Sequence, residues 1–171
     1  LRRYLDAFTT ASKNQSEIVY LDLFGGQPQN RERLTEADLD GSARIALATS
    51  DAPFSRLRFF ELEPFATRLR SALGADFAGR DFEVVAGDCN LTIRTTLASL
   101  ASVNWAPTFA FVAPNGPDVH WSTLEAISKF LTRKRGTIYP INPTLKTLLD
   151  ELLVADTARK KTLGMQTLFE G

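Results

Sequence analysis

IVYLDLFGG, residues 18–26, is the stretch of the sequence that decides the fold. Four apolar residues lead into Asp22, and Leu23 and Phe24 then precede two glycines. A short apolar run with β-branched residues and no helical period is typical of a buried strand in a parallel sheet. The glycines allow a sharp turn and leave room for a ligand against bare main chain. We therefore predict a strand whose carboxyl end faces a binding site.

Strands and helices alternate after this stretch, with short connections. The order predicts parallel strands joined by right-handed helical crossovers. We predict strands over residues 18–23, 56–61, 81–88 and 108–116, and helices over residues 1–14, 41–48, 64–73, 90–102 and 122–130. The polar residues 27–40 lack an apolar period and are predicted to form a surface loop. The fold class is therefore α/β, a three-layer αβα Rossmann-like parallel sheet.

Particular residues are expected to end these helices or to face the core. Ser42 and Ser122 are predicted N-caps, and Gly74 is predicted to stop the helix that Pro64 opens. Helical spacing predicts that Phe65 and Leu91 face inward, together with Leu69, Ala72, Leu73, Ile93, Leu97 and Leu100.

The pattern weakens after residue 131. Only Ile138 to Ile141 form a short apolar piece, which Pro140 and Pro143 interrupt. We assign residues 1–131 to the Rossmann-like domain and residues 132–171 to a C-terminal helix, about 144–155, and tail of the same domain. No further strong strand is evident there, so we expect the sheet to be incomplete on its C-terminal side.

Composition bounds the class of protein. At 171 residues with 44% hydrophobic residues, the chain matches one globular domain. No apolar run approaches the roughly 20 residues of a membrane span, and the N-terminus does not resemble a signal peptide. The single cysteine, Cys89, excludes an internal disulfide and a thiolate zinc cluster. We expect a cytoplasmic protein without a membrane partner. Because the sequence starts at Leu1, within a predicted helix, we interpret the chain as a fragment or a processed form.

Polar residues recur at the ends of the four predicted strands: Asp22, Glu61, Asp88 and the run Pro114-Asn115. A Rossmann-like sheet would bring them to one crevice. A site for S-adenosylmethionine (SAM) needs such a set, because one acid can accept the ribose hydroxyls, another can accept the adenine amine, and both favour the positive sulfonium. The formal net charge is zero, so a nucleic-acid partner is possible but gains no support from the charge.

Several motifs resemble a known family. DLFGG, FFELEP and GDCN are similar to the first three motifs of class I SAM-dependent methyltransferases, and FVAPNG is similar to the fourth motif of amino-methylating members. The ordered set LRRYLDAF, DLFGG, DGSARIAL, RFFELEP, GDCN and AFVAPNGPDVHW more closely resembles the three-Cys-motif partner proteins, over about residues 1–131. These are bacterial proteins with a methyltransferase-like core, named for a neighbouring three-cysteine protein. Such a protein is the partner that the resemblance implies.

The resemblance implies roles for individual residues. Glu61 would accept the ribose, Asp88 would contact adenine, and Glu63 is the less favoured ligand of its strand end. The cofactor loop would consist of Asp22, Phe24, Gly25 and Gly26, and the residues at the reacting group would be Pro114 and Asn115.

The chain departs from the family pattern at two positions. Pro28 stands where a further glycine is usual, and Ala113 stands where amino-methylating enzymes have an aspartate that accepts a hydrogen bond from the amine. Two functions therefore stay open: a SAM-binding methyltransferase-like protein acting on an amine of nucleic acid, or an inactive partner protein that works through protein–protein binding.

A third possible function is that of a Rossmann-like protein that binds a different nucleotide, but the sequence contains no Gly-x-Gly-x-x-Gly or P-loop motif. Structural roles are the default for four other residues that lie near the motifs, namely Cys89, Trp105, His120 and Trp121. The basic groups near residues 129–135 and 159–161 are interpreted as solvated surface.

Overall fold

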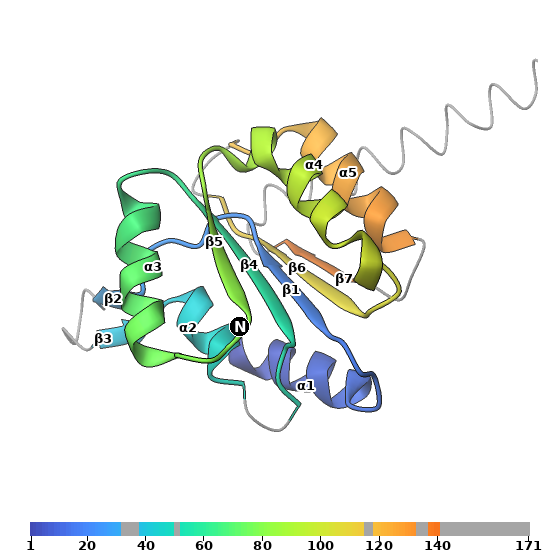
Figure 1. Cartoon of the computed structure of the whole chain (residues 1–171), viewed down its shortest axis with the longest axis horizontal. Coiled ribbons are helices and arrows are strands. Elements are labelled where there is room, and N and C mark those ends of the chain that lie inside the picture. Colours follow the sequence, from blue (N-terminus) through green and yellow to red (C-terminus); the bar gives the residue numbers. More distant parts are fainter. Residues whose placement is uncertain (32–37, 50–51, 115–117, 133–136, 141–171) are drawn as a thin grey trace, which may run out of the picture. The chain divides into compact units, whose positions relative to one another are not determined.

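The computed structural model describes residues 1–31, 38–49, 52–114, 118–132 and 137–140 (Figure 1). The chain divides into two compact units at Tyr139 and Pro140, and the fold below is that of the first unit. The predicted helix over 144–155 and the tail lie outside the described residues. No helix in the described ranges is long and apolar enough to cross a bilayer.

A five-stranded sheet forms the centre of this unit, in the order β5-β4-β1-β6-β7. Its strands are β1 (Val19–Asp22), β4 (Arg56–Glu61), β5 (Phe82–Ala86), β6 (Thr108–Val112) and β7 (Thr137–Pro140). The first four pair in parallel, as predicted. The strand order reverses next to β1, with β4 on one side and β6 on the other, as in doubly wound Rossmann-like sheets. The prediction of an α/β fold with a parallel sheet is confirmed.

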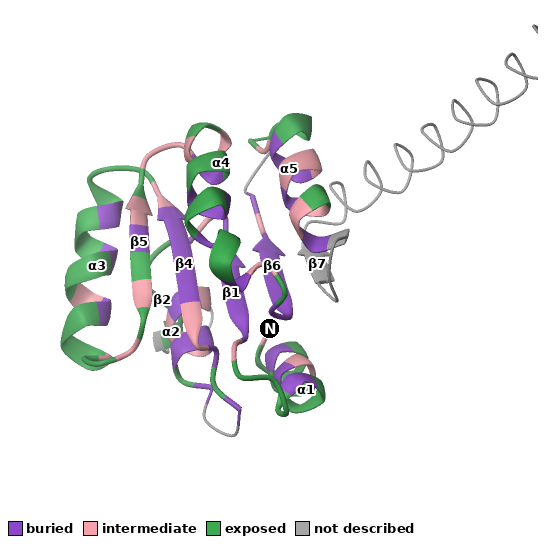
Figure 2. Cartoon of the chain, turned by 45° about the vertical axis from the view of Figure 1, so that its right-hand side comes forward, coloured by how far each residue is buried: buried purple, intermediate pink, exposed green. Residues whose placement is uncertain are grey.

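Helices cover both faces of the sheet (Figures 1 and 2). They are α1 (Arg2–Ser12), α2 (Ser42–Leu47), α3 (Phe65–Asp76), α4 (Cys89–Ser99), the 3₁₀ turn η1 (Ala101–Val103) and α5 (Trp121–Thr132). Side chains of α1, α2 and α3 share one hydrophobic core with alternate residues of the sheet. The helices α4 and α5 pack against each other. Figure 2 shows that β1 is buried along its length, whereas the edge strand β5 is partly open.

Aromatic rings fix the position of β1 in the sheet. The ring of Tyr20 stacks on Phe109 of β6 at 6.0 Å between centroids, and contacts Phe59 of β4 at 6.0 Å. Phe54, which precedes β4, lies 5.1 Å from the same ring. Large buried rings in contact stabilise a core beyond the area that they bury. The strand β1, which leads into the glycine loop, is therefore packed against both of its neighbours, β4 and β6.

The expectation of a plain loop over residues 27–40 is wrong. This segment contains two short antiparallel strands, β2 (Gln29–Arg31) and β3 (Asp38–Asp40). Main-chain pairing forms this ladder, and the side chains described in it, those of Gln29, Asn30, Leu39 and Asp40, are exposed. No apolar alternation was therefore present in the sequence to reveal the strands.

A fifth strand is also present where the sheet was expected to be incomplete. The strand β7 uses the short apolar piece between residues 137 and 140 and lies next to β6. Its four residues are too few to produce a clear periodic signal, and a proline ends it.

Three predicted helix ends are wrong. Gly74 lies inside α3, which continues to Asp76, and Gly41 rather than Ser42 is the N-cap of α2. Ser122 lies within α5, which begins at Trp121. Two residues predicted to face the core, Phe65 and Leu91, are exposed. Both stand in the first turn of a helix that follows a strand, close to the carboxyl edge of the sheet.

A substitution at Gly74 tests whether α3 continues through this residue. A Cβ at Gly74 would meet no atom within 4 Å, so we expect Gly74→Ala to raise the free energy of unfolding by about 0.5–1 kcal/mol. Gly79 is the matched control, because its surroundings are equally open but its φ is +88°. Gly79→Ala should lower the stability, since an L side chain is strained there. Urea unfolding of both variants measures the difference, and equal signs would contradict the assignment.

Candidate functional site

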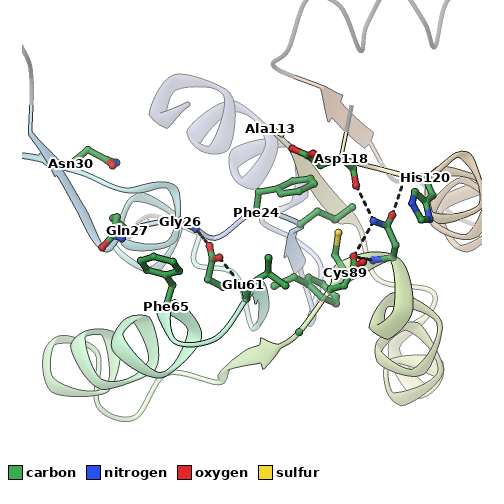
Figure 3. A pocket seen from close by; sticks show the side chains of 16 residues that line it. Phe24, Gly26, Gln27, Asn30, Glu61, Phe65, Cys89, Ala113, Asp118 and His120 are labelled. Atoms are coloured by element: carbon green, nitrogen blue, oxygen red, sulfur yellow. Dashed lines mark hydrogen bonds between the residues drawn. The ribbon is translucent and has the colours of Figure 1, made fainter. Parts of the chain in front are cut away.

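A cavity of about 810 Å³ opens at the carboxyl ends of β1, β4, β5 and β6 (Figure 3). Its position is the one where open α/β sheets bind ligands, beside the point where the strand order reverses. The loop after β1 supplies Leu23, Phe24, Gly26 and Gln27, and the β2–β3 hairpin supplies Asn30. The remaining lining residues are Phe60, Glu61, Leu62, Phe65, Gly87, Asp88, Cys89, Asn90, Ala113, Asp118 and His120.

The two glycines after β1 have different tasks. The Gly25 N–H donates to the Phe60 carbonyl at 2.9 Å, and a Cβ there would lie 3.0 Å from Leu69 Cδ2, so Gly25 packs inward. Gly26 has a φ of +64°, lines the cavity, and would place a Cβ in open space 3.8 Å from the Phe24 carbonyl oxygen. Of the two glycines, only Gly26 therefore exposes its main chain to the cavity.

Glu61 stands at the end of β4 with its carboxylate held in place. The Gly26 N–H donates to Oε2 at 2.7 Å, and the Leu62 N–H donates to Oε1 at 2.9 Å (Figure 3). Each carboxylate oxygen has a second lone pair that can accept another hydrogen bond. Glu63 does not line the cavity, and its carboxylate instead accepts the Thr67 hydroxyl at 3.0 Å. The strand end thus directs Glu61, and not Glu63, to the site.

Asp22 was expected to contact the ligand, but the structure buries it behind the wall of the cavity. Its carboxylate accepts the Phe24 N–H at 3.2 Å and the Tyr20 hydroxyl at 3.4 Å, and it also hydrogen-bonds Ser42 at the start of α2. Burial raises the pKa of Asp22 to about 6, although these hydrogen bonds partly oppose the shift. Asp22 therefore holds the glycine loop in place through its hydrogen bond with the Phe24 N–H, without lining the cavity.

Pro28 also helps to hold the loop after β1 in place. Its carbonyl accepts the Gly41 N–H at 3.0 Å, which ties the loop to the N-cap of α2. A Cβ on Gly41 would overlap the Gln27 carbonyl oxygen, so only glycine permits this approach.

Asp88 lines the cavity and also caps α4. Its Oδ1 accepts the Asn90 main-chain N–H at 2.8 Å and the Asn90 side-chain amide at 2.9 Å. Asn90 Nδ2 also donates to the Asp118 carbonyl, and Asn90 Oδ1 accepts the His120 N–H and the Thr123 hydroxyl, each at 2.8 Å. This one amide fastens the start of α4 to the segment that leads into α5.

Sequence reasoning missed Asn90. Its position two residues after an expected ligand, in a Gly-Asp-x-Asn run, is the signal that could have found it, because Asp and Asn side chains bind nearby main chain at helix starts.

The end of β6 contributes less than expected. Ala113 lines the cavity, whereas Pro114 is buried and is not among the lining residues. Asn115, the other residue expected at the reacting group, lies outside the described residues.

Cys89 and His120 complete the wall next to Asn90. Cys89 is buried, and burial, with the nearby charge of Asp88, raises the pKa of its thiol to about 11. The thiol is therefore protonated at neutral pH and is a poor nucleophile. The expectation of a structural role for Cys89 agrees with this geometry.

The charges on the wall have one sign. Glu61, Asp88 and Asp118 line the cavity, and no lysine or arginine is among the described lining residues. Parallel strands bring Glu61 and Asp88 together at one edge, as expected from the sequence. The cavity thus suits a cationic or neutral ligand better than an anionic one.

Comparisons with known proteins support the fold. No family model matches the chain, and no curated protein matches it. The chain is similar to the crystal structure of protein LPL1258 from Legionella pneumophila, of the family-model DUF519, with a TM-score of 0.52 and 15% sequence identity. The match covers 86% of this chain and 71% of that chain. At this identity the likeness shows the fold alone.

Of the residues expected to bind a cofactor, the structure brings four to the cavity: Phe24, Gly26, Glu61 and Asp88. Gly25 and Asp22 lie behind it, where they position the loop. The arrangement offers carboxylate acceptors, an open main-chain position and apolar side chains around one cavity. These are the elements of a site for a polar, partly aromatic small molecule.

Proposed function

We propose that this cavity binds S-adenosylmethionine and that the chain is a methyltransferase-like protein. The observation that carries the proposal is the set of carboxylates from Glu61, Asp88 and Asp118 around a cavity without a described basic side chain. When bound, the cofactor supplies a methyl group on a positively charged sulfonium. Carboxylates in a partly enclosed cavity stabilise such a charge.

The residues present fit the adenosyl part of this cofactor. The fixed carboxylate of Glu61 has lone pairs available for two neighbouring ribose hydroxyls, since its two main-chain donors occupy one position on each oxygen. Asp88 would accept the adenine amine, as the resemblance implies. Leu62 and Phe65 are exposed apolar side chains on the same wall and would contact the base.

Phosphate-bearing nucleotides fit the site less well. Their binding sites use helix N-termini, glycine-rich loops and basic side chains to hold negative oxygens. In this cavity the described charged side chains are acidic, and Asp88 itself occupies the N-cap of α4.

A calorimetric titration of the 171-residue chain tests the proposal. We expect SAM to bind at least tenfold more tightly than ATP or NAD, and S-adenosylhomocysteine, which lacks the positive charge, to bind more weakly than SAM. Binding of ATP or NAD with an affinity equal to or above that of SAM would overturn the proposal.

Ala113 favours a second candidate function, in which the chain binds the cofactor without transferring the methyl group. It lines the cavity with a methyl side chain where amino-methylating enzymes have an acceptor for the amine. On this alternative the chain is an inactive methyltransferase-like partner protein, and a three-Cys-motif protein is the proposed partner. The active alternative, methylation of an amine of nucleic acid, would need an acceptor other than the Ala113 side chain, and Pro114, expected at the reacting group, does not line the cavity.

Restoring the acceptor distinguishes the two. We expect Ala113→Asp to raise methyl transfer at least tenfold, because orienting the attacking group contributes on the order of 7 kcal/mol or more in such reactions. Incorporation of radiolabelled methyl groups from SAM into RNA, DNA and protein measures the change. Ala113→Leu, which adds bulk without an acceptor, is the control. Substantial wild-type transfer that Ala113→Asp leaves unchanged would contradict the inactive alternative.

A further inference from the structure

We infer that Asn90 is a positioning residue of the cavity, and that it sets how strongly the cavity prefers a ligand amine to a carbonyl oxygen at Asp88. This role deepens the proposed function and rests on it, because the amine is taken to be that of adenine. A part in the same preference falls to Thr123, a buried residue of α5 that does not line the cavity.

All four hydrogen-bonding positions of the Asn90 amide are in use. An amide nitrogen carries two hydrogens, and an amide oxygen carries two lone pairs. Nδ2 donates to Asp88 Oδ1 at 2.9 Å and to the Asp118 carbonyl at 2.8 Å (Figure 3). Oδ1 accepts the His120 N–H and the Thr123 hydroxyl, each at 2.8 Å. The amide is therefore fixed in orientation, because a rotation breaks several hydrogen bonds at once.

The hydrogen bonds to Asp88 leave one of its carboxylate oxygens for a ligand. Oδ1 accepts the main-chain N–H of Asn90 at 2.8 Å as well as the side-chain Nδ2. Oδ2 is therefore the oxygen available in the cavity, and its place depends on the two donors that hold Oδ1. An ionised carboxylate accepts hydrogen bonds and donates none, so Oδ2 attracts an amine and repels a carbonyl oxygen.

This arrangement contains more than the cap of a helix. The cap of α4 needs only the Asn90 main-chain N–H, which Asp88 Oδ1 accepts. The Asn90 side chain adds a connection to α5, through His120 and Thr123, that capping does not require. Removal of this side chain therefore keeps the cap of α4 and releases the Asp88 carboxylate from α5.

Thr123 is the far end of this connection. It is buried in α5, its N–H donates to the His120 carbonyl at 3.0 Å, and its hydroxyl donates to Asn90 Oδ1. Valine has nearly the same shape as threonine but cannot donate this hydrogen bond. Loss of the hydroxyl leaves the Asn90 amide with one donor fewer and loosens its hold on Asp88. Because Thr123 does not line the cavity, it acts on a ligand only through Asn90.

The quantity that tests this role is a ratio of two affinities. S-adenosylhomocysteine and S-inosylhomocysteine differ in the purine, where a carbonyl oxygen in the second replaces the amine of the first. Calorimetric titration of the 171-residue chain gives both affinities. We expect the wild-type chain to bind S-adenosylhomocysteine at least tenfold more tightly, because a carbonyl oxygen leaves Asp88 Oδ2 without a donor. A general loosening of the fold would weaken both ligands alike and leave the ratio unchanged.

Matched variants show whether the ratio depends on the amide. We expect Asn90→Ala to lower it at least fivefold, since the Asp88 carboxylate is then free to turn. Thr123→Val should lower it at least twofold, whereas Thr123→Ser, which keeps the hydroxyl, should keep the wild-type ratio. Thr96→Val is the control and should not change the ratio, because the buried Thr96 hydroxyl donates to the Thr92 carbonyl. Circular dichroism melting confirms that each variant is folded.

The outcomes separate this role from the proposed function. Equal wild-type affinities for the two ligands, or a ratio in Asn90→Ala equal to that of the wild type, would overturn the role of Asn90 and leave the binding of the adenosyl compound intact. Equal ratios in Thr123→Val and Thr123→Ser would overturn the part assigned to Thr123. A wild-type chain that binds neither ligand would overturn the proposed function, and the role of Asn90 with it.

Discussion

Glu61→Ala is expected to lower the affinity for SAM on the order of 100-fold. The substitution removes a charged acceptor for two hydroxyl groups, and hydrogen bonds to charged groups contribute about 1.5–3 kcal/mol. It also removes the acceptor of the Gly26 N–H, 2.7 Å away, and so releases the main chain that borders the ligand. Isothermal titration calorimetry of the variant with SAM measures the loss.

Glu63→Ala is the matched control for this prediction. It changes the net charge by the same amount two residues away, but Glu63 binds Thr67 and does not line the cavity. We expect a change in affinity of less than threefold. If the two variants lose affinity equally, the loss in Glu61→Ala comes from the change in net charge, and the assigned contact between Glu61 and the ligand is wrong.

Asp22→Asn is expected to stabilise the protein at pH 8. Burial raises the pKa of Asp22 from 3.8 to about 6, so between these values the folded state binds more protons than the unfolded state. The wild-type protein therefore loses stability as the pH rises from below 4 to above 6, on the order of 3 kcal/mol from this group. Asparagine cannot ionise, and its carbonyl oxygen can still accept the Phe24 N–H.

Urea unfolding of the wild type and Asp22→Asn at pH 4 and pH 8 measures this difference. The variant should exceed the wild type in free energy of unfolding at pH 8 and approach it at pH 4. Asp6→Asn, at an exposed position of α1, should show no such change between the two pH values. A variant that is less stable than the wild type at pH 8 would show that the ionised carboxylate of Asp22 is required by the fold.

The sequence predicted the parallel sheet because its strands are strongly apolar and its helices amphipathic. Val19 to Leu21 and Phe109 to Val112 are apolar and buried on both faces, and such runs can be recognised from the sequence alone. The hairpin β2–β3 and the strand β7 were missed, since three or four residues paired through main chain leave little pattern. The helix ends predicted at Ser42, Gly74 and Ser122 were also misplaced, because local propensity alone does not decide where packing ends a helix.

The site was only partly predictable for a related reason. Glu61 and Asp88 follow from strand ends in a parallel sheet, but the sequence does not tell which carboxylate turns toward the cavity and which, like Asp22, turns into the core. Phe65 and Leu91 have the helical spacing of core residues, yet each stands in the first turn beyond a strand, where the sheet no longer covers the helix. The same spacing that predicted them as core residues conceals their exposure.

The most direct test of SAM binding in the cavity is a titration of the ¹⁵N-labelled chain with SAM, followed by two-dimensional NMR of its main-chain amides. Gly26 and Leu62 donate their N–H groups to the Glu61 carboxylate, so a ligand that binds this carboxylate must change their environment. We predict that the largest shifts occur at Gly26, Leu62 and Asn90, and that they saturate with the affinity measured by calorimetry. Saturating SAM that leaves these three amides unchanged would contradict the assignment of the cavity as an adenosyl site.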